Sequence, residues 1–192
     1  MYLNMRLFFL WKKSIFAQNQ IAYMFLKGLQ YKSAKKALTK KLDNATAKEV
    51  SKTPIKTVGI IINADEMHNF DTVVKQLQIE ANVHVLCYHK DFKKTRTVNY
   101  PVFYQKDFGW KGKPQGKDLK QFFDTSFDVL ISYYNNNIVP LQLVSGLHKA
   151  DFKIGIEGCD QKIHDLIIQT KKEEVQTFVE ELHKYLHILN KL

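Results

Sequence analysis

Hydrophobic side chains recur at helical spacing near the start of the chain. Steps of three or four residues separate Phe8, Trp11 and Ile15, and again Ile21, Phe25 and Leu29. Such spacing places apolar side chains on one face of a helix. A second helix is predicted over residues 31–42, where lysines recur at the same steps on one face and alanine and leucine line much of the other.

From Thr57 onward the apolar positions form short continuous runs instead. Residues 58–62 read VGIII, which is typical of a strand buried on both faces. Further strands are predicted at residues 83–88, 102–104, 127–132, 152–156 and 164–168. Helices are predicted at residues 69–77, 118–123, 139–149 and 173–189. This alternation predicts an α/β fold with a mainly parallel twisted sheet between two helical layers, as in Rossmann-like and flavodoxin-like proteins.

The distribution of charge changes at the same place as the hydrophobic pattern. Residues 1–56 contain twelve basic and two acidic residues and carry +10, the whole formal net charge of the chain, whereas residues 57–192 are neutral. We therefore expect a basic helical arm over residues 1–56, first aromatic and then rich in lysine, and an α/β domain over residues 57–192. A cationic arm on a neutral domain indicates a polyanionic partner, either nucleic acid or an anionic membrane surface.

The lysine-rich half of the arm is the first candidate binding surface. A basic loop at residues 111–116 could extend it. The predicted polyanion-binding residues are Lys32, Lys35, Lys36, Lys40, Lys41, Lys111 and Lys113. Arg6 is the only arginine in the arm, and bidentate reading of bases favours arginine. We therefore expect contacts with phosphates and no sequence-specific reading of DNA. The alternative is a solvated helix face without a partner.

Polar side chains follow three of the predicted strands and define a second candidate site. In parallel α/β sheets, ligands bind where the carboxyl ends of strands meet. The residues of this possible crevice are Asn63, Asp65, Glu66, Asn135, Asn136 and Glu157. Carboxylates and amides in one crevice can support acid–base chemistry, although asparagine and aspartate at strand ends also form turns and caps. No individual catalytic residue is identified.

Motifs for cofactor binding are missing from the sequence. No glycine-rich turn follows the first predicted strand, and no Gly-Lys-Ser/Thr triplet occurs. No spacing of histidine and cysteine predicts a metal site, so we expect neither a metal nor a cofactor. The two cysteines, Cys87 and Cys159, fit a reducing compartment. No apolar run approaches the ~18 residues of a membrane span, and the cytoplasm is the expected location.

Four segments, taken in order, resemble a small bacterial family of unknown function. They are residues 58–62 (VGIII), 127–131 (FDVLI), 147–155 (LHKADFKIG) and 164–168 (HDLII). The resemblance covers most of residues 30–190 and implies a short basic helical N-terminus before an α/β domain, with no known activity.

The segment at residues 149–155 is also similar to a junction in heptosyltransferase-like glycosyltransferases. Those enzymes carry glycine and aspartate in the turn after their first strand, where this chain reads NADEM at residues 63–67. They also need a second nucleotide-binding domain, for which the chain has no room. We therefore interpret this second similarity as one of fold and not of sugar transfer.

The leading hypothesis is a non-enzymatic cytoplasmic protein that binds structured RNA or the ribosome through its basic arm. One alternative is a small-molecule-binding or enzymatic domain that acts at the strand-end crevice. Another is peripheral membrane association through the amphipathic first helix, with lysines held to anionic lipid. Exposed aromatic side chains over residues 8–31 would indicate a membrane or partner surface, whereas buried ones would leave only the lysine face for binding.

Overall fold

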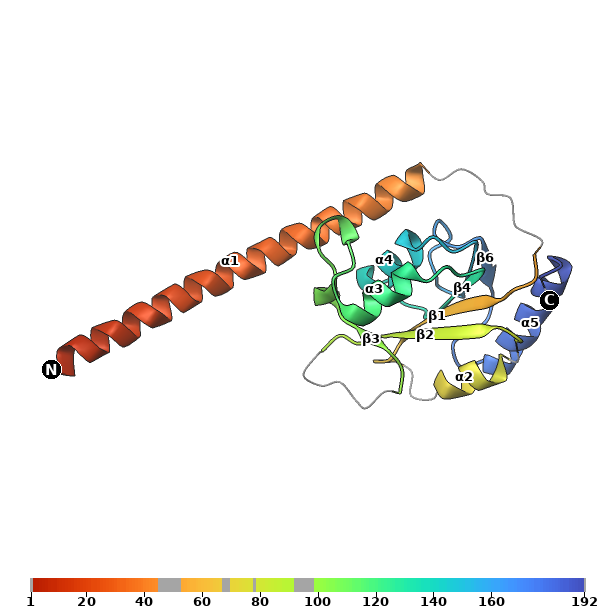
Figure 1. The fold of residues 1–192 in the computed structure, drawn as a ribbon, viewed down its shortest axis with the longest axis horizontal. Coiled ribbons are helices and arrows are strands. Elements are labelled where there is room, and N and C mark those ends of the chain that lie inside the picture. The colour runs from red at the N-terminus through yellow and green to blue at the C-terminus, as the bar shows by residue number, and fades with distance from the viewer. Residues whose placement is uncertain (1, 45–52, 67–69, 78, 92–98, 192) are drawn as a thin grey trace.

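The computed structural model describes residues 2–44, 53–66, 70–77, 79–91 and 99–191; the side chains of residues 2–22 and of Phe70 are outside this description. The chain begins with one continuous helix, α1 (Tyr2–Asp43), which extends well beyond the rest of the molecule (Figure 1). The two helices predicted for this region are therefore one. The segment contains no proline, and its one glycine, Gly28, costs a helix only about 1 kcal/mol.

A six-stranded parallel sheet forms the centre of the domain. Its strands are β1 (Thr57–Asn63), β2 (Asn82–Tyr88), β3 (Val102–Phe103), β4 (Val129–Tyr133), β5 (Phe152–Ile156) and β6 (Leu166–Ile168). They lie in the order β3-β2-β1-β4-β5-β6, and every adjacent pair is parallel. This confirms the predicted α/β class and parallel sheet. The direction of winding reverses between β1 and β4, which is the position where ligands bind in many folds of this kind.

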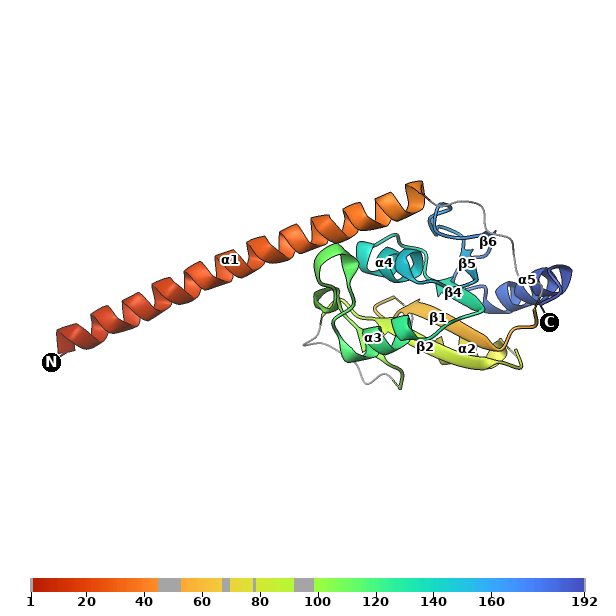
Figure 2. The ribbon, with the colours of Figure 1, turned by 45° about the horizontal axis from the view of Figure 1, so that its top comes forward.

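Helices cover both faces of the sheet. They are α2 (Phe70–Gln76), α3 (Lys117–Asp124), α4 (Val139–Leu147) and α5 (Val175–Ile188). The crossovers β1-α2-β2 and β4-α4-β5 run in opposite directions from the centre, so their right-handed geometry places α2 and α4 on opposite faces. Helix α2 packs with α5, and α4 packs with α1 (Figure 2).

The core joins the sheet to the second half of α1. Strand β1 is buried from Val58 to its last residue, as its unbroken apolar sequence predicts. Ala34 and Leu38 of α1 belong to the same core and are 1% and 5% exposed. The predicted apolar face of the lysine-rich segment is thus a docking face, and it leaves Lys32, Lys35, Lys36, Lys40 and Lys41 exposed.

Two short 3-10 turns, η2 (Gln105–Asp107) and η3 (Trp110–Gly112), lie between β3 and α3. The sequence predicted only a loop over residues 111–116. Turns of one 3-10 cycle are too short to show a hydrophobic period, so the sequence pattern does not reveal them. The η3 turn packs against α1, and its residue Lys111 lines a groove between the two elements.

Candidate polyanion interface

The η3 turn is fastened to α1 by a hydrogen bond and by close packing. The backbone N–H of Lys111 donates to Ser33 Oγ of α1 at 3.1 Å. Gly112 follows with a φ of 75°, and a Cβ atom at this position would collide with Leu147 of α4. Both the left-handed backbone and the close approach require glycine here. This junction fixes Lys111 beside the lysines of α1.

A groove of about 640 Å³ runs along this junction. Its lining residues are Ser33, Lys36, Ala37, Lys40, Lys41, Asn44 and Lys111. Of these described residues, four are lysines and none is acidic. Four of the seven predicted polyanion-binding residues thus line one concave surface. Lys111 comes from a segment some seventy residues away in sequence, so the fold concentrates positive charge that the sequence disperses.

Lys41 differs from the other lysines of the groove because it also holds α1 on the domain. Its Nζ donates to the backbone oxygens of Leu147 and His148 at 2.8 and 3.3 Å. These oxygens end α4, where the helix dipole favours a cation. Burial, followed by repulsion from Lys149, lowers the pKa of the Lys41 ammonium. Lys36, Lys40 and Lys111 are exposed and provide the accessible charge.

The other predicted lysines lie outside the groove. Lys32 and Lys35 are exposed on α1, and Lys113 is exposed at the end of η3. They extend the basic surface around the groove without lining it.

Apolar side chains in the middle of α1 face solvent. Tyr23, Met24, Phe25 and Leu26 are between 51% and 70% exposed, whereas Tyr31, closer to the domain, is half-buried. The aromatic side chains of residues 2–22, which were part of the predicted aromatic half, lie outside the described residues. The described part of this half therefore presents an apolar surface that the domain does not cover.

Three of the six residues of the predicted strand-end crevice, Asn63, Glu66 and Asn136, meet and bind one another. Asn63, the last residue of β1, donates through Nδ2 to Asn136 Oδ1 at 3.3 Å, and Asn136 Nδ2 donates to Glu66 Oε1. Lys172 Nζ lies 3.5 Å from the other oxygen of Glu66. This chain of contacts closes the carboxyl edge of the sheet between β1 and β4.

Asp65 is likewise engaged with neighbouring groups. Its carboxylate accepts a hydrogen bond from the N–H of Lys90 at 2.7 Å and lies 2.9 Å from His89 Nδ1. Asn135 and Glu157 are both exposed, and neither side chain takes part in the contacts described between Asn63, Glu66 and Asn136. The contacts of Asn63, Asp65, Glu66 and Asn136 are those of side chains that cap turns and strand ends.

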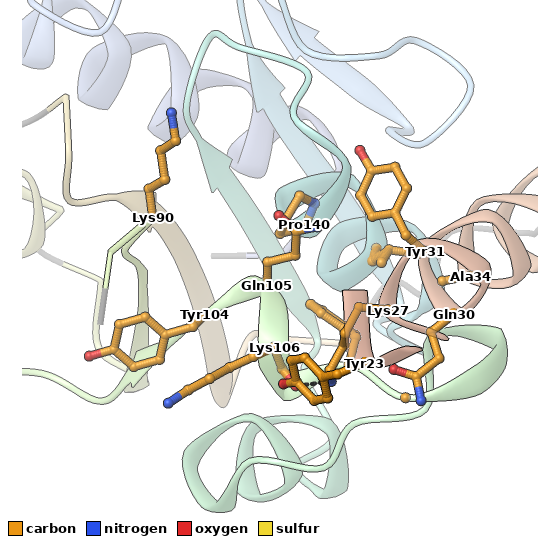
Figure 3. Close-up of a pocket in the computed structure, with 13 residues that line it drawn as sticks. Tyr23, Lys27, Gln30, Tyr31, Ala34, Lys90, Tyr104, Gln105, Lys106 and Pro140 are labelled. Carbon is orange, nitrogen blue, oxygen red and sulfur yellow. Dashed lines mark hydrogen bonds between the residues drawn. The ribbon is translucent and has the colours of Figure 1, made fainter. Parts of the chain in front are cut away.

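A second concave site lies where α1 crosses the carboxyl ends of β2 and β3. It is a cavity of about 290 Å³, between Tyr23, Lys27, Gln30 and Tyr31 of α1 and Lys90, Tyr104 and Lys106 after the strands (Figure 3). The sequence pattern does not predict this cavity, because its two walls are separated by some sixty residues or more. The one signal available was the alternation of tyrosine and lysine in both segments.

Within the residues that the structure describes, no group of three or more His, Cys, Asp or Glu side chains is arranged to hold a metal ion. Over the same residues, the helices lack the combination of length and apolar character needed to cross a membrane.

Fold and site together define a doubly wound α/β protein whose N-terminal helix builds a lysine-lined groove with the domain. The chain belongs to a family described as "Family of unknown function (DUF6913)", whose model matches residues 30–189. This match begins within the docked part of α1 and confirms the predicted membership of an uncharacterised family. Comparison with curated proteins and with solved structures gave no match, so the similarity to heptosyltransferases stays a sequence-based resemblance.

Proposed function

We propose that this protein binds structured RNA, alone or in the ribosome, through the groove between α1 and η3, and that it does so in the cytoplasm. The observation that carries the proposal is the convergence of Lys36, Lys40, Lys41 and Lys111 on one concave surface that has no acidic residue among its described lining residues. Phosphate groups are the ligands that such a surface attracts, and RNA offers them in a regular row.

The chemistry of the groove favours the RNA backbone over base edges. Lysine ammonium groups bind phosphate as point charges, whereas arginine supplies the planar fork that reads bases. The whole sequence has only two arginines, Arg6 and Arg96, and the described residues that line the groove include four lysines and no arginine. We therefore expect affinity that depends on RNA shape and ionic strength more than on base sequence.

The salt dependence can be estimated from the number of lysines. Four phosphate contacts correspond to a slope of about −3 for log K against log salt concentration. The association constant should then fall roughly 60-fold between 50 and 200 mM salt.

The test is a fluorescence anisotropy titration with a labelled RNA hairpin. A variant with Lys36→Gln, Lys40→Gln and Lys111→Asn should bind at least tenfold more weakly, and its salt slope should be shallower by about 2–3 because each phosphate contact contributes about 1. Lys111 has a φ of 55°, a left-handed conformation that asparagine adopts more readily than lysine. The Lys111→Asn change therefore removes charge without straining the turn.

The matched control removes three charges elsewhere. Lys75, Lys162 and Lys184 are exposed and do not line the groove. Their triple change to glutamine alters the net charge equally and should weaken RNA binding less than threefold. Equal losses for the two triple variants, or an affinity that does not respond to salt, would contradict the proposal.

Peripheral membrane association is a second candidate, and the exposed apolar side chains of α1 favour it. Phe25 is 67% and Met24 is 70% exposed, and lysines follow them on the same helix. Such a helix can lie in a bilayer interface with its lysines on anionic lipid. Co-sedimentation with phosphatidylcholine–phosphatidylglycerol vesicles tests this candidate. Phe25→Ser with Leu29→Ser should abolish co-sedimentation while leaving RNA affinity unchanged.

The strand-end crevice offers a weaker basis for catalysis. Two of its three carboxylates, Asp65 and Glu66, already contact His89, Lys90, Asn136 and Lys172, and the third, Glu157, is exposed and takes no part in the contacts between Asn63, Glu66 and Asn136. An acid or base that works on a substrate needs a group free to exchange a proton with it.

A further inference from the structure

The geometry points to a nucleotide-binding cavity between α1 and the carboxyl ends of β2 and β3, which receives one unstacked nucleotide of an RNA whose backbone lies in the neighbouring groove. The inference rests on the proposed function and adds to it a single-stranded feature that the protein recognises. Four features of the cavity support the inference. They are its charge, its aromatic lining, the unpaired amide oxygen of Gln30 and its position beside the groove.

The lining of the cavity combines positively charged side chains with buried apolar ones. Among the described residues, three lysines and no acidic residue line it. Ala34, Phe108 and Leu143 are also in the lining, and all three are buried. An anionic group bound to an apolar body fits this combination, whereas a cation or a strongly hydrated sugar does not. At about 290 Å³ the cavity is at the small end of ligand sites and suits one nucleotide.

Two of the four aromatic residues that line the cavity, Tyr23 and Tyr104, carry a lysine ammonium group over the ring. Lys27 Nζ lies 5.7 Å from the centre of the Tyr23 ring, and Lys106 Nζ lies 5.3 Å from that of Tyr104. Lys27 Nζ also donates to the backbone oxygen of Lys106 at 3.4 Å, which joins the two walls. Figure 3 shows these side chains gathered at one side of the cavity, with Lys90 directed away from them. Tyrosine faces for stacking and ammonium groups for phosphate are what single-stranded RNA requires.

Gln30 supplies a group that could read a base edge. Its side-chain Oε1 is buried and has no hydrogen-bond partner, and the residue lines the cavity. A buried unpaired amide oxygen is costly, so its partner is expected to come from a ligand. The exocyclic amino group of a base is such a donor, and glutamine pairs with adenine in this manner elsewhere.

The cavity and the lysine groove follow one another along α1. Gly109 lines the cavity and Lys111 lines the groove, so the η3 turn lies between the two sites. Lys27 and Lys40 are thirteen residues apart on one helix, or about 20 Å at the helical rise per residue. This span accommodates several nucleotides, with backbone phosphates in the groove and one base turned into the cavity.

The first experiment compares two RNA probes, a hairpin with an unpaired loop and a blunt-ended duplex of the same length. The wild-type protein should bind the hairpin at least tenfold more tightly. Gln30→Trp fills the cavity and should lower the hairpin affinity to that of the duplex without changing duplex binding. Gln176→Trp, on the exposed surface of α5, is the control and should preserve the preference. Equal affinity for both probes, or a preference that survives Gln30→Trp, would overturn the cavity assignment while leaving RNA binding intact.

A second experiment keeps the assignment testable if RNA binding itself fails. Adenosine monophosphate is titrated against the labelled protein, and the Gln30 side-chain amide resonance is followed by NMR. A shift in the wild type that is lost in a Lys27→Gln, Lys106→Gln variant supports the nucleotide site even without RNA. Absence of both the shift and RNA binding overturns both proposals. A hairpin with 4-thiouridine in its loop should crosslink to Tyr23, Tyr31 or Tyr104, and crosslinks confined to other segments would count against the cavity.

Discussion

Leu38 of α1 occupies the space where a side chain at Gly146 of α4 would begin. A Cβ atom built on Gly146 collides with the Leu38 side chain, and Leu38 is only 5% exposed. The absence of a side chain at Gly146 therefore lets the two helices approach closely and docks α1 on the domain.

We predict that Gly146→Ala destabilises the protein by about 1–3 kcal/mol, as overpacking of a core does. Alanine has the better helix propensity by about 1 kcal/mol, but the steric conflict with Leu38 outweighs it. Urea denaturation followed by circular dichroism measures the change in the free energy of unfolding.

The double variant Leu38→Ala with Gly146→Ala tests whether contact with Leu38 causes the loss of stability. Leu38→Ala alone should cost about 2–5 kcal/mol through the cavity it leaves. Because the added methyl group at Gly146 then enters that cavity, the two changes together should cost less than their sum. Strict additivity would show that Leu38 is not what excludes a side chain at Gly146.

The carboxylate of Asp128, at the turn before β4, holds the beginning of β1. It accepts hydrogen bonds from the N–H groups of Lys56 and Thr57 at 2.8 and 2.9 Å and from Thr57 Oγ1 at 3.0 Å. All three bonds end on Oδ2, so Asp128→Asn can keep an acceptor oxygen there but removes the negative charge that strengthens the bonds, and it should cost about 1–3 kcal/mol of stability. Asp124→Asn, at an exposed position, is the control and should have almost no effect in the same denaturation assay.

The contribution of Asp128 should also depend on pH. Burial raises the pKa of its carboxyl, but the three hydrogen bonds outweigh burial and hold the pKa below the ordinary 3.8. A depressed carboxyl pKa stabilises the fold above the unfolded pKa, and this stabilisation is lost as the pH falls through the folded pKa. The difference in unfolding free energy between wild type and Asp128→Asn should thus shrink below about pH 4. A constant difference down to pH 2 would contradict this.

We expect the protein to lose stability in mild acid because of two buried histidines, His148 and His164. Burial lowers the pKa of both His148 and His164 below 6.5, and Lys153 adds repulsion to each. The His148 ring also stacks on Phe127 with 4.9 Å between ring centres. The unfolded chain therefore takes up protons first, and the free energy of unfolding falls as the pH drops below about 6.5, by up to about 1.4 kcal/mol per pH unit for each histidine.

The measurement is the unfolding free energy at pH 7.5 and pH 5.0. His148→Gln and His164→Gln should each reduce the difference between the two values. His187→Gln, at an exposed position, should leave it unchanged. A stability that does not vary between these pH values would contradict the prediction.

The two cysteine thiols should resist modification in the folded protein. Burial is the main cause that raises the pKa of both Cys87 and Cys159 to about 12. The reactive thiolate is therefore scarce at neutral pH. Ellman's reagent at pH 8 should titrate almost no thiol in native buffer and two per chain in concentrated guanidinium chloride. Rapid reaction of one thiol in native buffer would show that its surroundings open readily.

The strands could be predicted from the sequence because burial on both faces of a parallel sheet demands unbroken apolar runs, as in residues 58–62. The helical period likewise predicted an apolar face at Ala34 and Leu38 of the lysine-rich segment, but not that this face docks on the domain. The continuity of α1 was missed because the change from aromatic to lysine-rich composition is not a break in the backbone. The pairing of Asn63 with Asn136 was anticipated from the shared edge of the sheet, but not that these side chains would satisfy one another.

The sequence by itself determined the class of fold, the membership of an uncharacterised family and the concentration of charge in the arm, since these depend on local pattern and composition. Only the tertiary structure decided that Lys111 joins Lys36 and Lys40 in one groove, and that Tyr104 and Lys106 line one cavity with Tyr23 and Lys27. Those contacts arise from close packing at single points, such as Leu38 against Gly146. Packing of this kind depends on the shapes of side chains that are far apart in sequence, and no period along the chain records it.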